Sequence, residues 1–129
     1  MSVEVSNVEP KEVWKNFVLL NEVPRPSKKE DRVIEFLISF ATKNNLIYKQ
    51  DEIGNLVIVK DSTPDMITRE TVVLQSHVDM VHEKNNDVEF DFLNSGIKMY
   101  VDGDWVKADG TTLGADNGLG VAAIMAILE

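Results

Sequence analysis

Two short stretches of the sequence contain the residues whose types and spacing could do chemistry. His77 and Asp79 stand two positions apart after an apolar run, and in extended backbone such a pair lies on one side of the chain. Imidazole is a good zinc ligand, and a nearby carboxylate can orient its ring and raise its basicity. Asp116 is a lone acid between Gly114 and Gly118, where a polar loop gives way to an apolar helix. These two stretches predict part of a metal site, with His77, Asp79 and Asp116 as the candidate site residues.

Each of these residues also has a simpler interpretation. A histidine two positions before an aspartate is common on protein surfaces, and Asp is a good N-cap for the helix that follows residue 116. His82 lies close to His77 in the sequence, but nothing in its spacing favours a ligand. Residues 118–123 fit the glycine pattern of a dinucleotide-binding loop. No buried strand precedes them, however, and Asp116 would repel a pyrophosphate at that helix end.

Length and composition limit the class of protein. The 129 residues, 43% of them hydrophobic, suit one globular domain spanning residues 1–129. A net charge of -9 argues against nucleic acid and anionic membranes as partners. The absence of cysteine leaves His, Asp and Glu as the strong metal ligands and is common in cytosolic chains, so we expect a cytoplasmic protein. No signal peptide is visible in residues 1–10, and the apolar run at 119–128 is too short to span a bilayer.

Hydrophobic periodicity predicts two helices and then two hairpins. Apolar residues at helical spacing indicate a helix from Pro10 to about residue 20, which the prolines of residues 23–26 end. Residues 27–30 have the Ser-x-x-Glu form of a capping box, and a second helix is expected from there to residues 44–45. Residues 46–48 and 56–59 form the expected first hairpin, and residues 97–101 and 105–108 the second.

The remaining apolar segments predict the fold class. Residues 71–74 suit a strand buried on both faces, which would place His77 and Asp79 at the sheet edge where ligands bind in α/β folds. The helix expected from about Leu119 is apolar on every side and should be buried on every side. We therefore expect an α/β fold in which helices cover both faces of a mostly buried sheet. It should be incomplete at its C-terminal side, because the chain is the N-terminal part of a longer protein or because a partner covers the last helix.

Four stretches in this order resemble one known family. Residues 23–30, 51–56, 74–81 and 110–118 are similar to the N-terminal part of an aminoacyl-histidine dipeptidase, of the peptidase D or Xaa-His dipeptidase group of di-zinc metallopeptidases. The resemblance extends from about Val13 to the end of the chain. It implies a three-layer α/β/α catalytic domain that hydrolyses Xaa-His dipeptides with two zinc ions per full-length subunit. Cobalt and manganese are alternatives to zinc as the native metal. A homodimer is an alternative to a monomer for the full-length protein.

The resemblance also assigns roles to the candidate residues. It implies that His77 binds one zinc, that Asp79 orients the imidazole, and that Asp116 bridges both zincs and is followed by a cis peptide bond. The remaining zinc ligands, the general-base glutamate and a late histidine would lie after residue 129. We therefore expect the fragment alone to be inactive and to bind zinc weakly, if at all.

Two rival interpretations remain. One is a non-catalytic interaction module that docks on a partner through its apolar last helix. The other is an aminopeptidase or deacylase of the same di-zinc clan, which would share the His-x-Asp pattern and a later bridging acid. If the chain forms a metal site, His77 and Asp116 should converge within metal-ligand distance, whereas a docking module does not require this.

Overall fold

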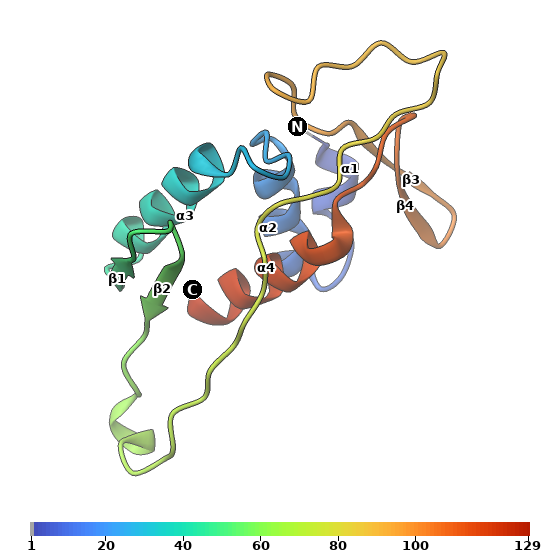
Figure 1. Cartoon of the computed structure of the whole chain (residues 1–129). Helices are drawn as coiled ribbons and strands as arrows, with labels where there is room; N and C mark the ends of the chain where they lie inside the picture. The colour runs from blue at the N-terminus through green and yellow to red at the C-terminus, as the bar shows by residue number, and fades with distance from the viewer. Residues whose placement is uncertain (1) are drawn as a thin grey trace.

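The computed structural model describes residues 2–129, and Met1 lies outside the described residues. The two ends of the described chain are helical, and two hairpins lie between them (Figure 1). The elements in chain order are α1 (Val3–Ser6), α2 (Lys11–Asn21), α3 (Asp31–Lys43), β1 (Ile47–Gln50), β2 (Leu56–Val59), the 3-10 turn η1 (Pro64–Met66), β3 (Met99–Asp102), β4 (Trp105–Ala108) and α4 (Ala115–Leu128).

Helices α2 and α4 pack against each other and form the centre of the molecule. Two apolar clusters lie on either side of this pair. One cluster joins Phe17 and Val18 of α2 to Ala122 of α4, to α1 and to β3. The other joins Leu20 of α2 and Val121 of α4 to the buried face of α3. The helix pair therefore belongs to both clusters, which fixes where the start of α4, with Asp116, lies in the molecule.

Both predicted hairpins are confirmed. In the first, β1 pairs antiparallel with β2 from Ile47 opposite Val59 to Gln50 opposite Leu56. Its turn is held by Asp51, whose carboxylate accepts backbone N–H groups of three following residues and the side-chain amide of Asn55. In the second, β3 pairs with β4 through a two-residue turn in which Gly103 has a positive φ of 59°. The predicted helices α2 and α3 are confirmed as well.

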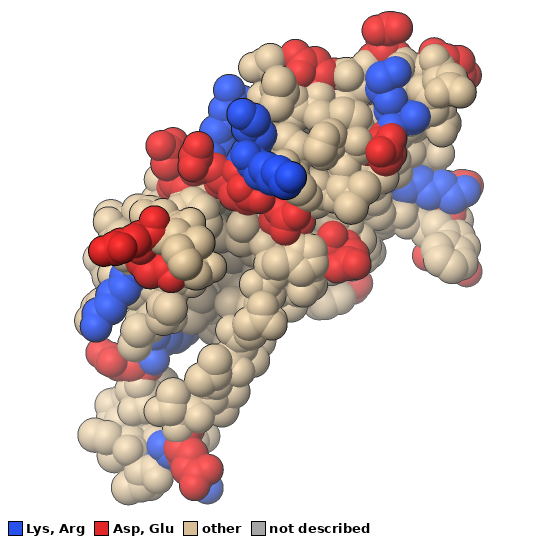
Figure 2. All heavy atoms as spheres, viewed as in Figure 1, with Lys and Arg blue, Asp and Glu red and all other residues tan. Residues whose placement is uncertain are grey.

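The strand predicted at residues 71–74 is wrong for this structure. The segment runs in extended form across the molecule after η1 without pairing to a strand in the described residues (Figure 1). Val72 and Val73 are 78% and 84% exposed. In the space-filling view the segment is a narrow, mostly uncharged ridge that stands away from the body (Figure 2). A β-branched run becomes a buried strand only when neighbouring strands pair with it and cover it, and residues 2–129 place none beside it.

The described residues therefore form an α/β chain with two small antiparallel sheets. A layered sheet with helices on both faces stays a prediction. None of the helices described in residues 2–129 is long and apolar enough to cross a membrane.

Helix α4 is only partly buried, which corrects the expectation of burial on every side. Gly118, Val121, Ala122 and Met125 are buried, whereas Ile127 is 61% exposed. The buried positions follow helical spacing and face α2, so the described chain covers one face of the helix. The helix also begins earlier than predicted, at Ala115, and Asp116 in its first turn has non-helical backbone angles.

Candidate metal centre

The structure brings the three predicted site residues together around the imidazole of His77. Its Nε2 atom lies 3.1 Å from Oδ1 of Asp116, which is 39 positions away in the sequence. Its Nδ1 atom lies 3.1 Å from Oδ1 of Asp79. The extended segment at residues 77–79 supplies two of these side chains and the first turn of α4 supplies the third. His77 and Asp116 thus converge, as a metal site requires and a docking module does not.

The contacts of His77 fit those of a metal-ligating histidine. Neutral imidazole has one N–H, and a ligating histidine commonly donates it to a carboxylate while the other nitrogen binds the metal. If Nδ1 donates to Asp79, Nε2 presents a lone pair to a carboxylate oxygen of Asp116, an arrangement that needs a proton or a cation between the two atoms. Two ligands of one tetrahedral zinc lie roughly 3.3 Å apart for bonds of about 2.0 to 2.1 Å. The observed 3.1 Å is close to that spacing.

Solvent reaches this group of residues. The side chain of His77 is 49% exposed and that of Asp116 is 96% exposed. Partial desolvation lowers the pKa of His77, but the hydrogen bonds with Asp116 and Asp79 outweigh it, so the pKa lies above its ordinary value. The two acids thus favour a positive charge at the imidazole. Within residues 2–129, no group of three or more His, Cys, Asp or Glu side chains is placed to hold one metal ion.

The carboxylate of Asp79 is itself held by Ser27. The Ser27 hydroxyl donates to Oδ2 of Asp79, while the other oxygen faces His77. The hydrogen bond from Ser27 is the main reason that the pKa of Asp79 lies below its usual value, and the contacts with His77 add to it. Backbone bonds from Ser27 N–H to Met80 O and from Met80 N–H to Arg25 O fix the two segments side by side. The result is a chain of contacts from Ser27 through Asp79 and His77 to Asp116.

The capping box predicted at residues 27–30 is therefore wrong. Helix α3 begins at Asp31, and Glu30 makes no side-chain cap. Its carboxylate instead accepts the N–H of Lys28, and the Ser27 hydroxyl turns to Asp79, 52 positions away. A charged acceptor makes the stronger hydrogen bond.

The peptide bond after Asp116 is cis, as the resemblance implied. It joins Asp116 to Asn117, whose carbonyl accepts a hydrogen bond from Ser76 at 3.3 Å. The loop carrying Asp116 is thus tied to the residue before His77.

The chain is similar to peptidases of known structure or name, although no family model matches it. It is 43% identical over 125 residues, 97% of this chain, to the cytosol non-specific dipeptidase of Escherichia coli strain K12. It matches the structure of the aminoacylhistidine dipeptidase of Vibrio alginolyticus with a TM-score of 0.94 and 42% identity over 98% of this chain. The predicted resemblance to aminoacyl-histidine dipeptidases is confirmed. The chain spans 26% of the length of each of these relatives.

A more distant likeness supports the fold alone. A tripeptidase from Staphylococcus aureus matches with a TM-score of 0.69 and 24% identity, over 94% of this chain and 32% of that one. Like the two dipeptidases, it is longer than the segment it shares with this chain.

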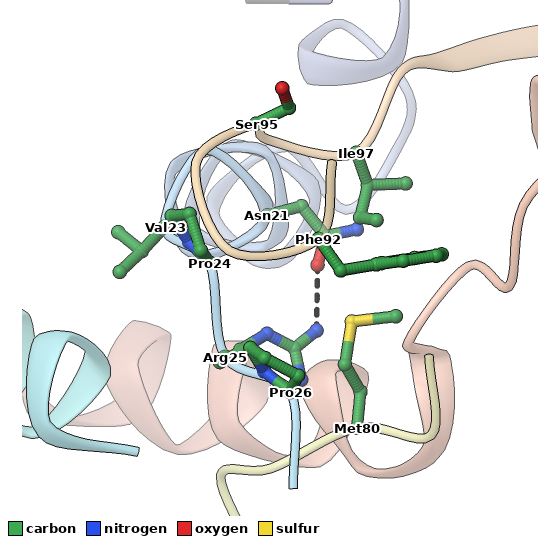
Figure 3. A pocket seen from close by; sticks show the side chains of 9 residues that line it. All are labelled: Asn21, Val23, Pro24, Arg25, Pro26, Met80, Phe92, Ser95 and Ile97. Carbon is green, nitrogen blue, oxygen red and sulfur yellow. Dashed lines mark hydrogen bonds between the residues drawn. The ribbon is translucent and has the colours of Figure 1, made fainter. Parts of the chain in front are cut away.

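Sequence reasoning missed two buried polar residues behind the candidate site. Asn21 and Arg25 are each 1% exposed and are joined by a 2.6 Å hydrogen bond (Figure 3). Asn21 also donates to Leu113 O at 2.9 Å, just before the loop of Asp116. The available signal was an arginine between two prolines, Pro24 and Pro26, in a stretch that carries the resemblance. Its partners are distant in the sequence, so spacing does not reveal them.

Proposed function

We propose that this chain carries part of the metal centre of a zinc-dependent dipeptidase that, as a full-length protein, hydrolyses dipeptides of the Xaa-His type. The observation that carries the proposal is the convergence of His77 Nε2 and Asp116 Oδ1 at 3.1 Å, with Nδ1 held by Asp79. Two ligating side chains from distant segments, with the ring of one oriented by an acid, form a metal-site pattern.

Each residue has a distinct task in this proposal. His77 binds zinc through Nε2, and Asp79 acts through His77 by fixing the tautomer and the ring orientation. Asp116 offers a carboxylate that can bridge two metal ions. A bound zinc ion supplies Lewis-acid chemistry, polarising the scissile carbonyl and activating water for attack. The exposed side chain of Asp116 leaves this side of the site open to a small peptide substrate.

The similar proteins support the substrate class and the compartment. One is named a cytosol non-specific dipeptidase and the other an aminoacylhistidine dipeptidase. We extend to this protein a small peptide substrate and a cytoplasmic location. Zinc is the proposed metal, with cobalt and manganese as alternatives, and a homodimer of the full-length protein stays open.

The proposal also limits what residues 1–129 do by themselves. A catalytic zinc normally has three protein ligands, and here one histidine and one shared acid converge. We propose that the further ligands and the general base come from outside these residues. We propose that the chain alone binds zinc weakly and does not turn over substrate.

The test compares the full-length protein with this chain. In the full-length protein, hydrolysis of a β-alanyl-histidine or aminoacyl-histidine dipeptide should require zinc, and His77→Ala and Asp116→Ala should each abolish it. His82→Ala is the matched control and should keep activity. Residues 1–129 alone should show no turnover, and tight one-to-one zinc binding with turnover by this chain would contradict the proposal.

An interaction module remains the alternative from another class. The exposed face of α4, with Ile127 61% exposed, is the observation that favours it. An aminopeptidase or deacylase of the same clan is the alternative enzyme. Activity on N-terminal residues of longer peptides, or on N-acyl amino acids, in place of Xaa-His dipeptides would identify it.

A further inference from the structure

Arg25 is a charged side chain in the interior, where it must have partners. It is 1% exposed, and burial lowers its pKa to about 10, while the charge of Asp79 acts in the opposite direction. The guanidinium therefore stays protonated at neutral pH. Burying such a charge is costly unless hydrogen bonds compensate, so its contacts indicate why it is there.

The two terminal nitrogens of Arg25 hold the two segments that carry the metal-site residues. Nη1 donates to Val78 O at 3.2 Å, and Val78 lies between His77 and Asp79. Nη2 donates to Gly114 O at 2.9 Å, two positions before Asp116. A guanidinium is a rigid plane, so two bonds from one plane fix the separation of the two carbonyls.

The glycines around Asp116 leave room for this guanidinium. A Cβ on Gly114 or on Gly118 would lie 2.6 Å from Nη2 of Arg25. The hydrogen bond from Nη2 to Asn21 Oδ1 fixes the guanidinium to the end of α2 (Figure 3). Arg25 is thus enclosed between α2, the segment of His77 and the first turn of α4.

We infer that Arg25 is a positioning residue that sets the spacing between His77 and Asp116 and thereby the metal affinity of the pair. This inference rests on the proposed function, because it assumes that the two side chains bind a metal. This role differs from a purely structural one in one respect. Metal binding must weaken even when a substitution preserves the fold and the charge, if it removes the paired hydrogen bonds to Val78 O and Gly114 O.

The test uses the imidazole signals of the ¹⁵N-labelled chain during titration with zinc chloride. The chain has two histidines, and His82, whose ring lies 5.7 Å from that of Phe92, is the internal reference. In the wild type, zinc should shift Nε2 of His77 and leave His82 unchanged. Absence of a His77 response both in this chain and in the full-length protein would overturn the proposed metal site itself.

Arg25→Lys then tests the positioning role. Lysine keeps the charge but has a single nitrogen that cannot hold both carbonyls in one plane, so the zinc affinity measured at His77 should fall about tenfold or more. Arg32→Lys is the matched control, because Arg32 donates to Leu93 O at the surface, and it should keep wild-type affinity. In Arg25→Ala, added guanidinium should restore part of the affinity. Wild-type affinity in a folded Arg25→Lys chain would overturn the inference and leave the proposed function intact.

If Arg25→Lys does not fold, a measurement on the wild-type chain tests the positioning role instead. The chain has three arginines, so their guanidinium signals can be assigned. Arg25 should give separate, slowly exchanging Nη signals that shift when zinc binds, unlike the averaged signals of exposed Arg69. The inference would be overturned if the Nη signals of Arg25 were averaged, or if they did not shift when zinc binds.

Discussion

At the residue scale, the Ser27 hydroxyl lowers the pKa of Asp79. In the metal-free chain, Ser27→Ala should raise the pKa of Asp79 toward its usual value, because the Ser27 hydroxyl makes the hydrogen bond that lowers it most. A depressed carboxyl pKa adds stability above the unfolded value of about 3.9, and this stability is lost as pH falls through the folded pKa. The stability difference between wild type and variant should therefore disappear in acid.

Carbon-13 NMR of the Asp79 carboxylate measures this pKa directly. Ser39→Ala is the matched control, because the Ser39 hydroxyl donates to Glu35 O on α3 and touches no carboxylate. An unchanged Asp79 pKa in Ser27→Ala would contradict the prediction.

The sequence indicates the candidate site residues themselves. It does not indicate the residues that hold them in place, Ser27 and Arg25. His77, Asp79 and Asp116 stand out because few side chains bind metal, and the structure brings these three together. The sequence separation of Ser27 and Glu30 fits a local capping box, which is why the pattern predicts one. The Ser27 hydroxyl instead bonds to Asp79, 52 positions away. Arg25 was missed for the same reason, since its contacts to Val78 and Gly114 depend on the fold.

At the element scale, the first hairpin depends on the charge of Asp51. The hydrogen bond from the Asn55 side chain, with backbone N–H bonds, lowers the pKa of Asp51. The ionised form therefore favours the turn above the unfolded pKa of about 3.9, and this support is lost as pH falls through the folded pKa. In an amide NMR titration, the signals of Ile53, Gly54 and Asn55 should move together with the Asp51 carboxylate. Asp51→Asn should remove that transition, and Asp61→Asn, after β2, should keep it.

The buried and exposed faces of α4 should respond differently to truncation. Met125 is 2% exposed within the second apolar cluster, so Met125→Ala should cost about 2 to 5 kcal/mol of unfolding free energy. Ile127 is 61% exposed, and Ile127→Ala should change it by about 0.5 kcal/mol or less. Urea denaturation of the two variants measures the difference. An equal loss in both would mean that the outer face of α4 is also covered, for example by a second copy of the chain.

Local patterns predicted the elements that are stabilised locally. Helices α2 and α3 and both hairpins have their apolar spacing or turn residues within a few positions, so the sequence indicates them directly. Residues 71–74 have the composition of a strand, but a strand also needs neighbours, and the described chain supplies none. The all-round apolar composition of α4 likewise predicted burial on every side, whereas the described chain covers one face of the helix.

At the scale of the whole molecule, the stability of the fold should not depend on metal binding at the candidate site. The two buried clusters that hold the helices together are apolar, whereas His77 and Asp116 lie at the surface. Domains built around a structural zinc unfold when the metal is removed. Here EDTA should leave the far-ultraviolet circular dichroism spectrum unchanged and shift the melting temperature by less than about 1 °C, because metal binding adds to a core that already exists.

Added zinc should act by mass action alone. A ligand that binds only the folded state stabilises it by RT ln(1 + [L]/Kd), so zinc at ten times its Kd should add about 1.4 kcal/mol to the free energy of unfolding. His77→Ala should abolish this gain without lowering the stability of the metal-free chain by more than about 0.5 kcal/mol, since the ring is half exposed. A large loss of structure in EDTA would instead make the metal part of the fold. The convergence of His77 and Asp116 would then be a consequence of metal binding, and no longer a property that the polypeptide sets through its own contacts.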